Sequence, residues 1–162
     1  MDLLPEIRSI ASTTVDDAEP FDSIDYMHLR PGHVNQLNEL LSDVFWPGID
    51  VSDMLHAPEC GIVAMYRRLI VGCVLATPDG YIAFVAVRPT WTGLGIGSRM
   101  MTWVCESLKH DVTLHVSANN PAVIIYQQLG FKAEEFVLDF YEKYMPPEST
   151  DSRHAFFLRM RK

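Results

Sequence analysis

Glycines that could hold a phosphate lie in a short turn between an apolar run and a helical pattern. The residues of this turn are Thr92, Gly93, Leu94, Gly95, Ile96, Gly97 and Ser98. Glycine lets the backbone approach a phosphate closely, and the free N–H groups at the start of a helix point towards such an anion. The segment therefore predicts a pyrophosphate-binding turn. A tight strand-to-helix turn that binds no ligand is the alternative.

Two other phosphate-binding motifs do not match this turn. A dinucleotide fingerprint requires an acidic residue at the end of a following strand, about 20 residues further on, and none stands there. A P-loop requires Gly-Lys-Ser/Thr, which the turn lacks.

A second motif begins at Asn119, ends at Phe131 and reads Asn-x-x-Ala-x-x-x-Tyr-x-x-x-Gly-Phe. Together and in this order, the two motifs resemble those of the GNAT acetyltransferase superfamily, and the resemblance covers residues 26–162. In that superfamily an Arg/Gln-x-x-Gly-x-Gly/Ala motif binds the pyrophosphate of acetyl-CoA. Thr92 stands at the Arg/Gln position of this chain, so anion binding is expected to rest more on backbone N–H groups.

The resemblance implies acetyl-CoA as the cosubstrate and CoA as a product. The backbone of Val85, Ala86 and Val87 is then expected to pair with the pantetheine arm as an added strand would. The alternative for these three side chains is a place in the core. Asn119 is expected to cap the following helix and to lie beside the coenzyme.

Acetyl transfer to an amine needs an acceptor for the amine proton and an acid for the departing thiolate. Many lysine acetyltransferases of the superfamily carry a glutamate on the strand before the glycine motif, but residues 81–87 contain no carboxylate. In the N-terminal acetyltransferases that the chain also resembles, a strand tyrosine and a histidine act through water, which implies Tyr81 and His115. Asp79 is the weaker candidate base, with a solvated turn aspartate as its alternative. Along the expected strand, apolar residues 112, 114 and 116 alternate with polar residues 113, 115 and 117, so His115 is expected to face away from the aliphatic side. For His115 the alternative is a structural histidine bonded to backbone.

Tyr126 matches the superfamily tyrosine that is placed to protonate the sulfur of CoA. A phenol, whose ordinary pKa is about 10, is a plausible acid for a thiolate of similar basicity. The alternative is an aromatic residue of the core.

Aromatic residues in or beside the expected loops are candidates for the walls of a substrate groove, with simple packing as the alternative. They are Phe45, Trp46, Tyr141 and Tyr144. Segments outside the two motifs resemble those of a histone acetyltransferase subunit of a chromatin-modifying complex, at residues 26–33, 44–52, 111–118, 137–141 and 154–158. This implies transfer to lysine Nε of histone-like tails, partner subunits and a nuclear location. The α-amine of a protein N-terminus is the alternative acceptor, and a non-catalytic module that binds acetyl-CoA or peptide is a third hypothesis.

The formal net charge of −8 is concentrated near the N-terminus. Residues 1–25 hold seven acidic side chains and one basic one, whereas the other 137 residues hold 14 acidic and 12 basic ones. We therefore expect an acidic mobile arm over residues 1–24, a folded domain over 25–162, and no nucleic-acid partner.

The three cysteines lie in apolar surroundings without metal-ligand spacing, which is typical of reduced thiols in an intracellular protein. No run of about 18 apolar residues is present, so we expect no membrane span. The residue pattern also predicts no metal site.

Hydrophobic periodicity predicts a single mixed α/β domain in the order βααβββαβαββ. With the superfamily resemblance, this implies a GNAT-like fold, a central mixed and mostly antiparallel sheet flanked by helices. The expected strands are residues 26–30, 61–66, 69–75, 81–87, 112–116, 131–141 and 154–160. The expected helices are residues 33–45, 50–56, 98–109 and 119–129. Residues 81–87 are apolar throughout, which predicts a central strand buried on both faces.

Overall fold

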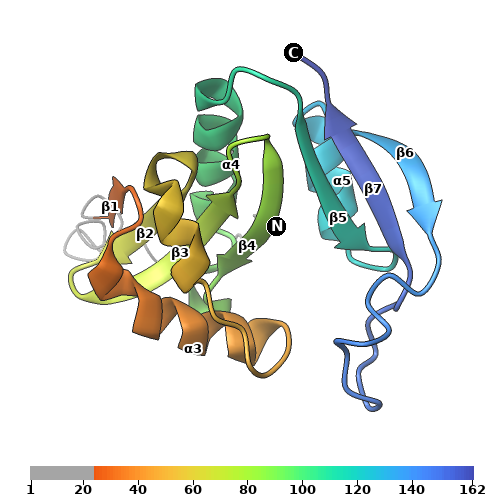
Figure 1. The fold of residues 1–162 in the computed structure, drawn as a ribbon, viewed down its shortest axis with the longest axis horizontal. Coiled ribbons are helices and arrows are strands. Elements are labelled where there is room, and N and C mark those ends of the chain that lie inside the picture. The colour runs from red at the N-terminus through yellow and green to blue at the C-terminus, as the bar shows by residue number, and fades with distance from the viewer. Residues whose placement is uncertain (1–23) are drawn as a thin grey trace, which may run out of the picture.

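One sheet organises residues 24–162, the part of the chain that the computed structural model describes (Figure 1). It contains 7 strands in the order β1-β2-β3-β4-β5-β7-β6. These are β1 (Ile24–Met27), β2 (Ile62–Tyr66), β3 (Leu69–Ala76), β4 (Tyr81–Val87), β5 (Val112–Ser117), β6 (Lys132–Val137) and β7 (Ala155–Met160). Only the β4–β5 pair in this described sheet is parallel, which confirms the predicted mixed, mostly antiparallel sheet. The acidic arm predicted for residues 1–24 lies outside the described residues, apart from Ile24 in β1.

The helices of the described residues follow the predicted order. They are α3 (Val34–Val44), α4 (Ile96–Ser107) and α5 (Ala122–Gln128), with short 3-10 helices at Pro31–His33, Ser52–His56, Pro58–Cys60 and Pro89–Trp91. The 3-10 helix at Ser52–His56 takes the place of the second predicted helix. Within residues 24–162, no helix combines the length and the apolar character needed to cross a bilayer.

Two helices cover opposite faces of the first half of the sheet (Figure 1). Leu37 and Leu41 of α3 are buried on one face, and Met100 and Val104 of α4 are buried on the other. Spacings of four residues place each pair on one side of its helix. The β3 strand contributes side chains to both packed faces of the sheet. Its successive side chains point alternately to the α4 side and to the α3 side.

The two central strands β4 and β5 stay together for only a short distance. Their parallel pairing consists of Tyr81 opposite Thr113 and Ile82 opposite Leu114. It begins where the Thr113 N–H donates to the Gly80 carbonyl at 2.9 Å. Beyond Ile82 the strands separate, and this leaves β4 bordered by β3 alone along the rest of its length.

This separation corrects the expectation that β4 is buried on both faces. Ile82 and Ala86 are buried, but Tyr81, Phe84 and Val85 are only half-buried and border a cavity. An apolar strand looks the same in sequence whether its side chains pack in a core or line an apolar site. The pattern therefore could not separate the two cases.

Most elements lie within two residues of their predicted bounds, but β1, α5 and β6 differ by three or four residues at one end. The β1 strand occupies Ile24–Met27 and not residues 26–30, and α5 begins at Ala122 and not at Asn119. The β6 strand ends at Val137 and not at residue 141. Asp139 has a positive φ of 54°, and this left-handed backbone turns the chain out of the sheet before Phe140.

We predict that Gly80→Ala destabilises the protein more than Gly48→Ala. Both glycines have a φ near 90°, but a Cβ at Gly80 would lie against the Asp111 carbonyl, whereas a Cβ at Gly48 would meet no atom within 4 Å. The free energy of unfolding, measured by denaturant titration, should fall by about 2–4 kcal/mol for Gly80→Ala. For Gly48→Ala it should fall by about 1–2 kcal/mol. Equal losses would show that the approach of β4 to Asp111 is not tight.

Candidate active site

A cavity of about 260 Å³ lies between the separated parts of β4 and β5. Its floor is formed by residues 81–85 of β4 and 114–117 of β5, with Tyr126 of α5. Its walls come from two loops, one that follows α3 and one that joins β6 to β7. The residues at positions 45–46 and 140–145 that belong to these loops are mostly aromatic, so the cavity is largely apolar.

Tyr81 and His115 form a hydrogen-bonded pair on the wall of this cavity. The Tyr81 hydroxyl lies 2.8 Å from His115 Nδ1. The two strands bring them together because Tyr81 is opposite Thr113, and His115 is the next residue of β5 on the same face. As predicted, Thr113 and His115 lie on the less buried face, while Val112, Leu114 and Val116 are buried. Ser117, predicted on the same face as His115, is buried as well.

Burial shifts the acidity of both partners towards their neutral forms. It lowers the pKa of His115 below its ordinary value of 6.5, an effect that the nearby Glu135 carboxylate partly opposes. It raises the pKa of Tyr81, which the neighbouring Tyr144 raises further. At neutral pH the pair therefore consists of a neutral imidazole and a neutral phenol, and the imidazole is able to accept a proton.

Tyr126 brings a third polar group to the same cavity from α5. Its side chain is partly buried, and the burial of the phenol raises its pKa to about 12. Burial raises the pKa of Tyr141, which lines the same cavity, and the Tyr81 and Tyr126 phenols raise it further. The burial of Tyr126 makes it a weaker acid than expected from its ordinary pKa, and it stays protonated up to about pH 12.

The four aromatic residues predicted as groove walls come together around the opening. Trp46 stacks on Tyr144, with ring centroids 4.9 Å apart and an interplanar angle of 18°, and it lies 6.0 Å from the ring of Tyr141. Phe45 contacts Trp46 and the Phe84 ring of β4. Loops that are almost 100 residues apart in the chain therefore form one aromatic wall.

Asp79 does not belong to this cavity. It lies in a separate depression with Lys109, Asp111 and Arg159, and its carboxylate accepts a hydrogen bond from the Thr77 hydroxyl. This arrangement agrees with the alternative interpretation of Asp79 as a turn residue. Among the described residues that line the cavity, Asp151 is the one with a carboxylate.

The glycine-rich turn starts α4 as the sequence predicted. Gly95 occupies the N-cap position with a φ of 82°, and it provides no side chain to cap the first N–H groups of the helix. A Cβ at Gly95 would meet no protein atom within 4 Å, so the space beside the helix start is open. Thr92 turns its hydroxyl to the Pro89 carbonyl, 2.9 Å away. The turn therefore fits a pyrophosphate held by backbone N–H groups rather than by the side chain at position 92.

The free edge of β4 leads from this turn to the cavity. Arg88 donates its N–H to the Val71 carbonyl of β3 at 2.8 Å, and Ala86 is paired with Cys73 of β3. Because hydrogen-bonding groups alternate along a strand, the N–H and C=O groups of Val85 and Val87 point away from β3. They face the side on which β5 no longer runs, and this edge fits the added-strand role expected for residues 85–87.

Asn119 has a different local role from the one predicted. Its side-chain oxygen accepts the Ser152 N–H at 2.8 Å, and its amide donates to the Thr150 carbonyl at 3.1 Å. The residue that holds the start of α5 is Asn120, whose side chain accepts the Ala122 N–H at 2.9 Å. Asn119 thus ties the β6–β7 loop to the end of β5, and the prediction that it caps α5 was wrong.

Sequence reasoning missed Phe140 and Asp151 as residues of the cavity. Both belong to the polar segment between β6 and β7, where position along the chain does not show which side chains turn inward. Phe140 could have been found from the sequence, because it stands next to Tyr141, which was already a candidate for the wall of the groove. For Asp151 the sequence carried no signal. Within residues 24–162 there is no group of three or more His, Cys, Asp or Glu side chains that could hold a metal ion.

Comparison with known proteins agrees with the fold and the site. Residues 57–133 match the family model described as an acetyltransferase (GNAT) domain. The fold is similar to Arabidopsis thaliana Naa50 in complex with the bisubstrate analogue CoA-Ac-MVNAL, with a TM-score of 0.72 at 23% sequence identity over 86% of this chain and 99% of that one. The chain therefore carries a GNAT acetyltransferase domain with the GNAT fold.

Two curated relatives are similar in sequence. The human cysteine-rich protein 2-binding protein is 45% identical over 150 residues, which are 89% of this chain and 19% of that protein. The Danio rerio N-alpha-acetyltransferase 50 is 26% identical over 129 residues, which are 72% of this chain and 77% of that protein. The chain thus spans about a fifth of the length of the first relative.

We predict that Gly95→Glu abolishes the binding of acetyl-CoA measured by isothermal titration calorimetry. The new side chain would place bulk and negative charge in the open space beside the first turn of α4. Gly95→Ala introduces the same left-handed strain without the charge, so it should retain most of the binding. Gly32→Glu adds the same charge on a distant 3-10 helix and should leave binding unchanged. Unaltered binding by Gly95→Glu would exclude this turn as the site.

Proposed function

We propose that this domain transfers the acetyl group of acetyl-CoA to an amine of a protein, with lysine Nε of a histone-like tail as the acceptor. The observation that carries acetyl transfer to an amine is the Tyr81–His115 pair, 2.8 Å apart, in an apolar cavity reached by the free edge of β4. The choice of lysine as the acceptor rests on the carboxylates of the loop between β6 and β7. The partner subunits and the nuclear location implied by the likeness to a histone acetyltransferase subunit belong to the same proposal.

The chain's residues divide the work between binding and proton transfer. Acetyl-CoA, when bound, supplies the acetyl group and leaves as CoA. Residues 93–98 hold its pyrophosphate by backbone N–H groups, and Val85 and Val87 pair with its pantetheine arm. The aromatic wall of Phe45, Trp46 and Tyr144 excludes water from the acceptor amine.

His115 is the proton acceptor in this proposal. Its pKa lies below 6.5 because of burial, so the imidazole is neutral at physiological pH. A water bound to the Tyr81 hydroxyl takes the proton of the amine, and this hydroxyl, which is hydrogen-bonded directly to His115 Nδ1, relays a proton to the imidazole. No carboxylate is needed on β4, and Asp79 is too far from the cavity to serve.

Tyr126 donates a proton to the departing thiolate. Its buried phenol remains protonated at physiological pH because its pKa is about 12. The surrounding apolar cavity strengthens the hydrogen bond from this phenol to a sulfur anion, since the effective dielectric constant is low there.

A cationic acceptor fits the charges at the opening. Asp151 is the one carboxylate among the described lining residues, and the β6–β7 loop that carries it also exposes Glu148, while the Glu142 carboxylate of this loop is paired with Arg153 at 3.6 Å. Such a surface attracts the positive charges of a lysine-rich tail.

The α-amine of a protein N-terminus is the second candidate acceptor. The Tyr81–His115 pair favours it, because the resemblance associates such a pair with N-terminal acetyltransferases. The likeness to N-alpha-acetyltransferase 50, and to a fold solved with a bisubstrate analogue, points the same way.

Labelled acetyl-CoA and two peptides separate these functions. One peptide carries a free N-terminus and no lysine, and the other has a blocked N-terminus and a central lysine. We expect label on the lysine peptide. Label on the free N-terminus alone would identify an α-amine transferase, and label on neither, with measurable acetyl-CoA binding, would identify a non-catalytic module.

We predict that Tyr126→Phe lowers kcat by roughly 10²-fold, within the range of general acid–base groups, and barely changes acetyl-CoA affinity. The variant removes one hydroxyl from a buried ring and keeps its packing against Phe131, 6.0 Å away between ring centroids. Steady-state kinetics and calorimetry provide the two measurements. Wild-type turnover would show that Tyr126 is a core residue and that solvent protonates the thiolate.

We predict that the rate of transfer falls as the pH drops through the pKa of His115. Because burial lowers that pKa, the imidazole stays neutral until the pH is below 6.5, and protonation then removes the base. On the alkaline side the rate rises towards the ordinary lysine pKa of about 10.4. The profile of kcat/KM against pH measures both effects.

Two variants test the assignment of the acidic inflection. His115→Ala should remove it and slow the reaction, whereas Asp79→Asn should leave the profile unchanged, since Asp79 lies outside the cavity. A parental profile for His115→Ala with an inactive Asp79→Asn would reverse the assignment.

A further inference from the structure

The imidazole of His115 lies against a second aromatic ring that the proposed mechanism does not use. The ring of Phe140 is stacked on it, with centroids 3.9 Å apart and an interplanar angle of 11°. Phe157 contacts it at 4.9 Å with a tilt of 48°, and Tyr81 meets it edge-on at 5.6 Å. The imidazole is thus bounded by rings from β4, β7 and the β6–β7 loop.

The backbone on both sides of Phe140 is fixed to the residues that precede β7. Asp139 donates its N–H to His154 Nδ1 at 2.9 Å, and Tyr141 donates its N–H to the Arg153 carbonyl at 2.9 Å. The positive φ of Asp139 turns the chain just before Phe140. These two hydrogen bonds leave the segment around Phe140 little freedom to move away from His115.

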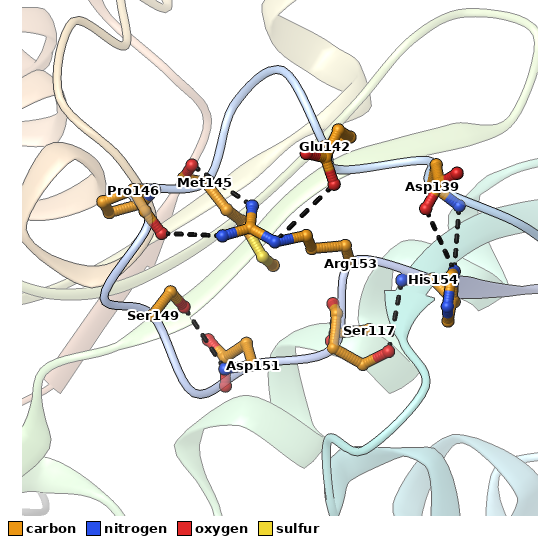
Figure 2. A network of polar contacts seen from close by, with 10 residues as sticks. Ser117, Asp139, Glu142, Met145, Pro146, Ser149, Asp151, Arg153 and His154 are labelled. Carbon is orange, nitrogen blue, oxygen red and sulfur yellow. Dashed lines mark hydrogen bonds and ion pairs between the residues drawn. The ribbon is translucent and has the colours of Figure 1, made fainter.

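The guanidinium of Arg153 connects several other residues of the β6–β7 loop. Arg153 donates to the carbonyls of Met145 and Pro146, at 3.3 and 3.0 Å, and lies 3.6 Å from the Glu142 carboxylate (Figure 2). At the other end, the Ser117 hydroxyl donates to the Ser152 carbonyl at 2.6 Å. The loop is therefore fastened to β5 only two residues beyond His115.

We propose that Phe140 is a positioning residue that holds the His115 imidazole in the plane in which Nδ1 meets the Tyr81 hydroxyl. A flat ring at 3.9 Å stops the imidazole from rotating about its Cβ–Cγ bond, and Phe157 limits movement on another side. This inference rests on the proposed function for its catalytic meaning, but the contact itself does not depend on any reaction. Its catalytic value is that His115 presents the same nitrogen to Tyr81 in every turnover.

The groups that face His115 define what its titration reports. Tyr81 of β4 is hydrogen-bonded to His115, and the Glu135 carboxylate of β6 raises the pKa of His115. The guanidinium of Arg159 lies 5.6 Å from the ring of Phe157 in β7, which contacts His115. The cavity also contains the phenols of Tyr126, Tyr141 and Tyr144 and the carboxylate of Asp151. Replacing Phe140 removes none of these groups, so a change in the titration reports the loss of the stacked ring.

The test compares Phe140→Ala, Phe140→Tyr and Leu138→Ala in the whole chain. Leu138→Ala is the matched control, because it truncates an apolar side chain of the same segment that is 68% exposed. The imidazole signals of His115 are followed by NMR against pH in protein without coenzyme or peptide, and they are assigned by their absence from His115→Ala. The kcat and KM values for acetyl transfer are measured on the same variants.

Phe140→Ala should admit water to one face of the imidazole, so the pKa of His115 should rise towards 6.5 and its two tautomers should become mixed. Its kcat should fall roughly 10- to 100-fold, with little change in the KM for acetyl-CoA. Phe140→Tyr should restore both properties, and Leu138→Ala should retain them.

An unchanged titration and tautomer in Phe140→Ala would overturn the inference, and so would a changed titration with an unchanged kcat. If the unaltered protein transfers no acetyl group, the proposed function fails. The NMR signals then still decide whether Phe140 holds His115.

Discussion

The early end of the parallel pairing between β4 and β5 is the constraint on which the site depends. Two residue pairs join the strands, at Tyr81–Thr113 and Ile82–Leu114, and no pairing follows. A continuous sheet would bury the N–H and C=O groups of Val85 and Val87 in a ladder and would fill the space above His115 with side chains. Because the strands separate, the same backbone groups form an open edge, and a cavity of about 260 Å³ lies beside it. The sheet therefore has fewer hydrogen bonds between β4 and β5 than a continuous sheet would have, and the space between the two strands is available to a ligand.

In the proposed function, the cavity performs proton transfer because distant segments close around a small number of polar groups. Tyr81 and His115 come from the two separating strands, and Tyr126 comes from α5. The loop between β6 and β7 covers them with Phe140, Tyr141 and Tyr144, and its internal hydrogen bonds to Arg153 and His154 keep it in place. Burial then keeps the imidazole and both phenols neutral near pH 7, which places a base and a proton donor in one largely apolar cavity.

Local sequence patterns predicted most of the fold, whereas contacts between segments distant in the sequence determine which residues line the site. The turn at residues 92–98 and the alternating burial of β5 could be predicted from the sequence, because glycine spacing and period-2 burial are local properties. The roles of Tyr81, His115 and Tyr126 came from resemblance, and the structure places all three on one cavity. Asp79 could not be excluded from sequence, because the separation of its turn from the cavity depends on how β4 meets β5. Phe140 and the true role of Asn119 depend on a loop whose folding is set by contacts with residues 150–154.

Amide hydrogen exchange at β4 tests most directly whether the open edge receives the coenzyme. Val85 and Val87 turn their N–H groups to the open side, whereas Arg88 donates its N–H to Val71 of β3. Acetyl-CoA should therefore slow exchange at Val85 and Val87 and leave the already protected Arg88 unchanged. Saturating acetyl-CoA with no added protection at either valine would contradict the account, because the coenzyme would then bind elsewhere and the separation of the strands would have another purpose.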